Sequence, residues 1–285
     1  MKVISLIIGC FLILPAFSQV KVKKIADLDD KMEETSGLVY YDKKYLITHN
    51  DGGNKSELFL LDLQGKLLKT IDIKDTKNRD WEDITSDNRG NLYIGDFGNN
   101  ENKREKLQIY ILKKGFVDEE EVEPDKITFE YPDQKEFPPK KKDMNYDCEA
   151  MIYKDGYLYL FTKCRTKPYT GISKIYRVPA REGKYDAEYI GELPLCNLGW
   201  KFCSVTAADY SEDLNTLVLL TYGRIYFISN FSGYNFWEGN INGINLSFIK
   251  QREAICFKNN TTLYMTDEFH PSLRGGNLYE LSVDL

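Results

Sequence analysis

Short runs in which apolar and polar residues alternate fill most of this chain, and they predict β-strands. Typical runs are "ELFLLDL" (57–63), "LQIYILK" (107–113) and "RIYFISN" (224–230), which are rich in aromatic and branched residues. Gly, Asn and Asp separate many of these runs, as expected for turns. We find no amphipathic helical period ten or more residues long. The chain is therefore predicted to be all-β.

Five segments of the chain resemble one another, each with a polar start, a turn and a second strand. They are "ETSGLVYYDKKYLITHND" (34–51), "DWEDITSDNRGNLYIGDF" (80–97), "DCEAMIYKDGYLYLFTKC" (147–164), "SVTAADYSEDLNTLVLLTYG" (204–223) and "QREAICFKNNTTLYMTDE" (251–268). Their third residues recur at spacings of 46, 67, 57 and 47 residues: Ser36, Glu82, Glu149, Thr206 and Glu253. Their second strands end at His49, Asp96, Lys163, Tyr222 and Asp267. Such regular repetition indicates a repeat architecture.

Two further strand-like runs follow each unit except the last, which has only "NLYELSV" (277–283). The run "VKVKKIADL" (20–28) can supply the missing strand, so we predict a five-bladed β-propeller closed by its N-terminal strand. The fourth strand of the fourth unit is expected at "INLSFIK" (244–250). A six-bladed ring is the alternative, because the longest spacing has room for extra strands. We interpret its charged parts, 118–125 and 138–143, as a solvated loop or hairpin extension.

The N-terminus predicts export. Residues 1–18 combine Lys2, an apolar stretch and small residues near Ser18, as in a secretory signal peptide. Residues 19–285 then form a single propeller domain, secreted, periplasmic or otherwise at the cell envelope. The alternative is a lipoprotein anchored through Cys10, since "IIGC" fits a lipoprotein cleavage box. No later run is long enough to span a bilayer.

Charge and cysteine content narrow the partners. The net charge of −6 disfavours nucleic acid and anionic membranes, so we expect an envelope glycan, peptide or protein and a monomeric chain. Five cysteines follow the signal, and export permits disulfides. Cys148–Cys164 and Cys196–Cys203 are the plausible pairs, and buried free thiols are the alternative for each.

Several of these motifs resemble those of a known family. "DWEDI", "LYIGDFGNN", "DCEAMIY", "SVTAADYS" and "REAICF" are similar to segments of a group of exported, largely uncharacterised bacterial β-propellers. A fainter similarity extends to phytase-type esterase-like and gluconolactonase-like propellers. Several of those place Glu, Asp and Asn around an axial divalent metal. The Glu-Gly-Pro opening of the gluconolactonase group is missing here.

The repeats predict an acidic mouth of the central channel. Aligned inner strands would gather five carboxylates there: Glu82, Asp96, Glu149, Glu253 and Asp267. Two carboxylates ~5.5 Å apart repel by roughly 3 kcal/mol at an effective dielectric of ~20, so compensation is required. Lysine or arginine, raised pKa values or a bound cation would provide it. Calcium suits an oxygen-only ligand set, whereas the two histidines make zinc a poor fit. The alternative is that these acids hydrogen-bond backbone amides between blades.

Two functions remain open from the sequence. The first is a ligand- or partner-binding module at the cell envelope, and the second is a calcium-type hydrolase of an ester, lactone or phosphoester. No nucleophile elbow, P-loop or dinucleotide motif is present. Lys163 would either neutralise Glu149 or hold an anionic ligand. The predicted ligand-binding residues are His49, Asp51, Lys163, Arg165, Tyr222 and Arg252.

Overall fold

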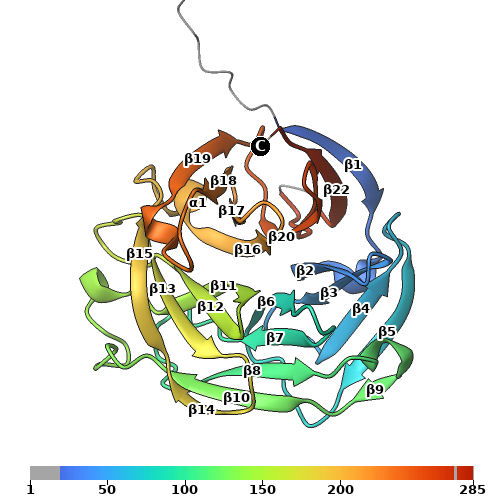
Figure 1. The fold of residues 1–285 in the computed structure, drawn as a ribbon, viewed down its shortest axis with the longest axis horizontal. Coiled ribbons are helices and arrows are strands. Elements are labelled where there is room, and N and C mark those ends of the chain that lie inside the picture. The colour runs from blue at the N-terminus through green and yellow to red at the C-terminus, as the bar shows by residue number, and fades with distance from the viewer. Residues whose placement is uncertain (1–19, 273–274, 285) are drawn as a thin grey trace, which may run out of the picture.

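The computed structural model describes residues 20–272 and 275–284, so the predicted signal peptide and Cys10 lie outside the described residues. Five sheets stand around one central axis (Figure 1). The principal strands of the blades, from the axis outward, are β2 (Thr35–Tyr41), β3 (Tyr45–Asn50), β4 (Glu57–Leu61) and β5 (Leu67–Ile73); β6 (Trp81–Ser86), β7 (Leu92–Asp96), β8 (Leu107–Leu112) and β10 (Asp125–Glu130); β11 (Asp147–Lys154), β12 (Tyr157–Lys163), β13 (Ile172–Pro179) and β15 (Glu188–Pro194); β16 (Val205–Ser211), β17 (Thr216–Thr221), β18 (Arg224–Ser229) and β19 (Asn240–Asn245); and β20 (Arg252–Asn259), β21 (Thr262–Asp267), β22 (Asn277–Ser282) and β1 (Lys21–Asp27). The chain is a five-bladed β-propeller, as the repeats predicted.

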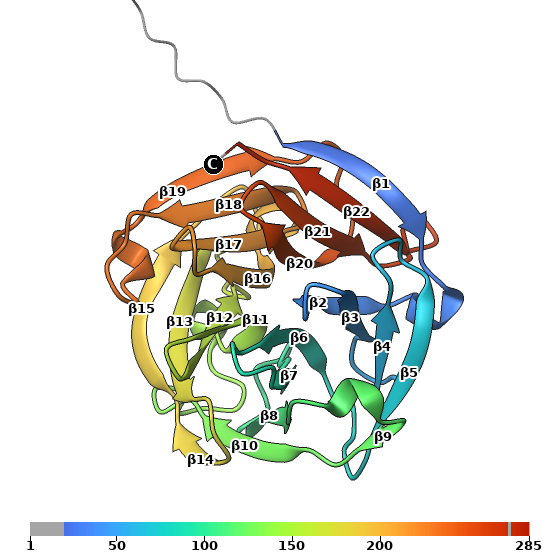
Figure 2. The ribbon, with the colours of Figure 1, turned by 45° about the vertical axis from the view of Figure 1, so that its right-hand side comes forward.

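The ring is closed by the N-terminal strand. β1 pairs antiparallel with β22, with Lys21 opposite Ser282 and Asp27 opposite Asn277. The last blade therefore consists of three C-terminal strands and one N-terminal strand, which Figure 2 shows stacked side by side. Both the five-blade prediction and the predicted closure are confirmed.

Short outer strands account for the long spacing. β14 (Gly183–Asp186) leaves the third blade and pairs parallel with β10 of the second. β9 (Glu121–Val122), in the charged stretch that was expected to be loop or hairpin, pairs parallel with β5 of the first blade. Both strands widen existing blades rather than building a sixth. β19 begins at Asn240, earlier than the sequence predicted, because the exposed outer strand carries little hydrophobic alternation.

The core lies between blades. Tyr93 and Phe129 of the second blade pack with Met151 and Tyr176 of the third, for example. The helical elements are short: the helix α1 (Trp200–Cys203) and the 3-10 turns η1 (Asp30–Met32), η2 (Phe116–Asp118), η3 (Lys141–Asp143) and η4 (Phe236–Glu238). Within the described part of the chain, no helix has the length and apolar character needed to cross a membrane.

Candidate functional site at the channel mouth

A β-bulge near the start of every inner strand positions the predicted glutamates. The strand register shifts across Glu82, Glu149 and Glu253, and across Gly37 and Thr206 at the equivalent points of the other two blades. A bulge leaves one residue unpaired and re-aims its side chain. All three glutamates are buried, and the Glu149 carboxylate interacts electrostatically with those of both Glu82 and Glu253. The structure therefore brings the three together.

Lys163 is the buried cation of this cluster. Its Nζ donates to Glu149 Oε2 at 2.7 Å and to the Tyr222 hydroxyl at 3.4 Å. Burial alone would lower the pKa of Lys163, but the neighbouring Glu149, Tyr222 and Glu253 raise it well above its usual value. Lys163 is therefore charged and neutralises Glu149, which was one of its two predicted roles.

Arg165 borders the cluster on the outer side. Its Nε donates to Asp147 Oδ2 at 2.5 Å and one Nη to Glu149 Oε1 at 3.3 Å. The same nitrogen donates to the amide oxygen of Asn100, on a loop of the second blade. Arg165 is partly buried, so it both balances the acids and links the second and third blades at the mouth.

Three other carboxylates form a compact group. One oxygen each of Asp51, Asp80 and Glu82 lies within 4.8 Å of the other two. Gly52 and Gly98 make room for them, because a Cβ at Gly98 would lie within 2.5 Å of the carboxylate oxygens of both Asp80 and Glu82. In the described part of the chain, none of the three makes an ion pair within 4.0 Å.

Burial gives this group unusual titration. It raises the pKa of Asp51 to about 6 and, together with the nearby Asp147 carboxylate, that of Asp80 to about 6. Burial and the Glu149 carboxylate raise the pKa of Glu82 well above its usual value. Oxygens bound to one calcium ion at 2.3–2.6 Å lie at most roughly 5.2 Å apart. The spacing and the donor type of the three residues therefore fit a divalent cation that prefers oxygen.

Asp96 and Asp267 lie elsewhere. In β12 and β17 the residues equivalent to them are Thr162 and Thr221, one position before Lys163 and Tyr222, because Cys148 pairs with Thr162 and Val205 with Thr221. A one-residue shift turns a side chain to the opposite face of a sheet. The alignment that grouped the two aspartates with Lys163 was thus wrong by one residue.

Both aspartates are held within their own blades. Asp96 accepts from Arg104 at 3.0 Å. Asp267 accepts from the Tyr279 hydroxyl at 2.8 Å and lies 2.9 Å from Lys250 Nζ. The structure therefore satisfies each of them in a separate network away from the three glutamates.

His49 and Arg252, which the sequence suggested as ligand-binding residues, are used in packing. His49 is fully buried, its Nδ1 lies 2.9 Å from the Asn50 carbonyl, and burial lowers its pKa to about 4. The Arg252 guanidinium donates to the carbonyl oxygens of Tyr222 and Phe248. Neither side chain is presented to the mouth, whereas Asp51, Lys163, Arg165 and Tyr222 contribute to it.

Two acids of the mouth escaped the sequence analysis. Asp80 stands two residues before Glu82, and the matching position before Glu149 is also an aspartate, so the repeats carried a signal. Glu268 follows Asp267, and its side chain accepts from Gln251. Burial and the Glu253 carboxylate raise the pKa of Glu268 to about 10. Burial also raises the pKa of Glu253 to about 7.

Other polar groups tie the inner strands together. The Asp83 carboxylate accepts from the backbone N–H groups of Ile84 at 2.9 Å, Met151 at 2.8 Å and Ala208 at 3.3 Å, in three different blades. Asp209 likewise accepts from Phe257 N–H at 2.7 Å in the next blade. Acids that hydrogen-bond backbone amides between blades, one predicted alternative, thus exist beside the mouth cluster, in different residues.

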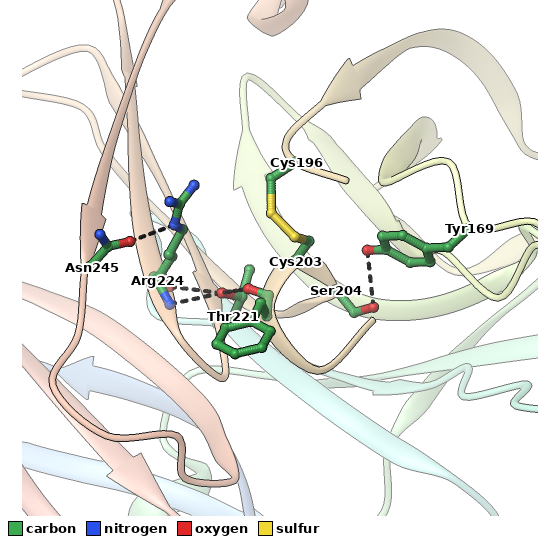
Figure 3. Close-up of a disulfide and its surroundings, with 8 residues drawn as sticks. Tyr169, Cys196, Cys203, Ser204, Thr221, Arg224 and Asn245 are labelled. Atoms are coloured by element: carbon green, nitrogen blue, oxygen red, sulfur yellow. Dashed lines mark hydrogen bonds between the residues drawn. A yellow bond between two sulfur atoms is a disulfide. The ribbon is translucent and has the colours of Figure 1, made fainter. Parts of the chain in front are cut away.

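One predicted disulfide is present. Cys196 and Cys203 are bonded, with Cα atoms 5.4 Å apart, and the loop they close lies beside Ser204 and Tyr169 (Figure 3). The Cys148–Cys164 pairing was wrong: both thiols are free and buried. Thr162, not Cys164, lies opposite Cys148, and the Cys164 sulfur contacts Thr166 and Thr170 instead.

Comparisons with known proteins agree on the fold. No protein-family model matches the sequence, and neither does any curated protein. The structure is similar to the PQQ-bound form of aldose sugar dehydrogenase from Streptomyces coelicolor, at TM-score 0.54 and 9% identity, over 93% of this chain and 99% of that one. It is also similar to the Malassezia sympodialis allergen Mala s 1, at TM-score 0.54 and 13% identity, over 92% and 95%. A putative gluconolactonase matches at TM-score 0.50 and 13% identity, over 95% and 93%.

The structural neighbours are distant β-propellers. At 9–13% identity they establish the architecture and nothing about activity. They include enzymes, so the choice between a binding module and a hydrolase depends on the mouth itself.

Proposed function

We propose that this protein is an exported ligand-binding module of the cell envelope whose channel mouth holds a divalent cation, with calcium as the natural class. The single observation that carries the proposal is the compact group of Asp51, Asp80 and Glu82. Three carboxylates this close repel one another when ionised, and the buried cation Lys163 is engaged with Glu149. A bound cation would relieve that repulsion and present a positive centre to a ligand at the mouth.

Calcium titration of residues 19–285 tests this proposal. Isothermal titration calorimetry should detect one calcium ion per chain, and calcium should raise the melting temperature. Asp80→Asn removes one ligand charge and should weaken binding by about tenfold or more. Asp213→Asn is the matched control, because Asp213 is exposed in the β16–β17 turn at the far end of its blade. Equal calcium affinity in both variants, or none in the wild type, would exclude the site.

The pH dependence of calcium binding provides a second check. Metal ligands must be deprotonated, and the pKa values of Asp51 and Asp80 are raised to about 6. Calcium affinity should therefore hold above pH 7 and fall by about 100-fold at pH 5, where each carboxyl is only about one-tenth ionised. Affinity that stays constant from pH 7.5 to pH 5 would argue against these two ligands.

Hydrolysis is the second candidate function, and the pKa of Glu253, raised to about 7, favours it. A carboxyl group that titrates near neutral pH can accept and return a proton in general acid–base catalysis. When bound, a divalent cation supplies Lewis-acid polarisation of an ester, lactone or phosphoester oxygen. Asp51, Asp80 and Glu82 would hold it, while Lys163 beside Glu253 would stabilise developing negative charge.

Activity measurements separate the two functions. p-Nitrophenyl acetate, bis-p-nitrophenyl phosphate and a simple lactone should be tested with calcium present. A hydrolase should lose at least ~100-fold in turnover with Glu253→Gln while keeping its calcium affinity. If none of the three substrates is cleaved while calcium binds, the binding-module function stands alone.

A further inference from the structure

A cavity of about 540 Å³ lies directly beside the channel mouth. Its walls come from the loop after β12 (164–170), from η3 and from Trp200 of α1, and Arg165 lines it where it meets the mouth. Two backbone hydrogen bonds join the first two walls: Arg165 N–H to the Met144 carbonyl at 3.1 Å and Lys167 N–H to the Lys141 carbonyl at 2.9 Å. The volume is in the range of small-ligand pockets.

The cavity is cationic although the chain carries a net charge of −6. Lys141, Arg165 and Lys167 line it, and none of its lining residues is acidic. Arg165 is engaged with Asp147 and Glu149. Lys141 and Lys167 are exposed, and over the described ranges neither ammonium group has a carboxylate within 4.0 Å. The two lysines are thus available to an anionic group.

Two aromatic side chains form the apolar part of the lining. Trp200 is 48% exposed, and its ring contacts the edge of Tyr222, the hydroxyl partner of Lys163, with centroids 6.4 Å apart. Tyr169 lies within hydrogen-bonding distance of Ser204, 3.4 Å between oxygens, next to the Cys196–Cys203 disulfide (Figure 3). Neighbouring contacts thereby hold both rings, which offer flat apolar faces against which a ligand ring can stack.

We propose that this cavity binds an acidic saccharide. Its sugar ring packs against Trp200 and Tyr169, and its carboxylate or phosphate lies between Lys141 and Lys167. A neutral sugar would leave both ammonium groups without a partner, and a purely aliphatic anion would leave the aromatic faces unused. This proposal deepens the proposed function, because it names the ligand class for the same mouth, and it rests on that function for its biological meaning.

The test titrates the protein with a galacturonic acid trimer, glucose 6-phosphate and the uncharged maltotriose, each with EDTA and with calcium. The acidic trimer or the sugar phosphate should bind, with an affinity that falls as salt rises, and maltotriose should bind at least about tenfold more weakly. The acidic probe that binds more tightly identifies the anion. Trp200→Ala and Lys141→Ala/Lys167→Ala should each weaken binding by about tenfold. All three positions are exposed, so both variants should fold like the wild type.

Matched controls make the result specific. Phe248→Ala removes an aromatic ring that is 85% exposed and does not line the cavity. Lys21→Ala/Lys66→Ala removes two exposed charges on the outer strand of the last blade and on the first blade. Neither control should change affinity. Equal binding of maltotriose, no binding of either acidic probe, or equal losses in controls and cavity variants would overturn the proposal.

The same experiment separates this inference from the calcium site. Asp80→Asn should abolish calcium binding and leave acidic-sugar binding in EDTA intact. Trp200→Ala should do the reverse. Loss of sugar binding in every variant, including Phe248→Ala, would count against the cavity, while an absent calcium signal would count against the mouth site only.

Discussion

Replacing Lys163 by methionine should destabilise the protein strongly. The ammonium lies 2.7 Å from Glu149 Oε2, and both side chains are buried. At an effective dielectric of ~20, that separation corresponds to roughly 6 kcal/mol of attraction before desolvation is subtracted. Removing one partner of a buried ion pair leaves the other charge uncompensated and typically costs about 3–5 kcal/mol. Arg165, at 3.3 Å from Glu149, can compensate only in part.

Chemical denaturation and thermal melting of Lys163→Met measure this loss. A domain of this size loses roughly 2–4 °C per kcal/mol, so the melting temperature should fall by roughly 6–20 °C. Burial raises the pKa of Glu149 well above its usual value. Since the group is then protonated more readily as pH falls, the variant should be less destabilised at pH 5 than at pH 8.

The double variant Lys163→Met/Glu149→Gln is the decisive control. It removes both charges, so much of the lost stability should return and the coupling in the double-mutant cycle should be large. If Lys163→Met melts like the wild type, or if the double variant is as unstable as the sum of the single ones, Lys163 does not neutralise Glu149.

Two further predictions concern the ring itself. Deleting residues 20–27 removes β1, leaves the edge of β22 unpaired, and should cause aggregation detectable by light scattering; a monomeric truncation with an unchanged unfolding midpoint would contradict the closure. Asp83→Ala leaves three buried backbone N–H groups without their acceptor and should cost roughly 3 kcal/mol in urea denaturation, more than Asp83→Asn, which keeps one acceptor oxygen. Equal midpoints for the two Asp83 variants would show that the carboxylate bridge does not matter.

The repeats predicted the architecture because hydrophobic alternation is strongest in the inner strands, which are buried on both sides. Glu82, Glu149 and Glu253 were found by their matching positions, and the bulges explain why these positions match. Outer strands were harder: β14 and β19 are largely exposed, so burial imposes little pattern on them. Strand β14 also crosses to a neighbouring blade, which is a tertiary choice that local sequence does not encode.

The errors at the site share a cause. Side chains alternate between faces, so an alignment displaced by one residue placed Asp96 and Asp267 with Lys163 and suggested the Cys148–Cys164 pair. Asp51 and Asp80 come from different blades, and their approach depends on how adjacent blades pack. Spacing along the chain shows that both precede or follow a strand, but not that their oxygens meet.

The Asp83 bridge has a consequence for access. Its carboxylate joins β6 to β11 and to β16, and β6 and β16 belong to blades that are not neighbours in the ring, so it lies across the axis. The mouth is thus the open end of a cup rather than of a tube. A polymer is unable to thread through it and has to be read sideways, along its length, as it crosses the rim. Recognition would then need no free chain end, and an internal segment of a long envelope chain would be as good a target as its terminus.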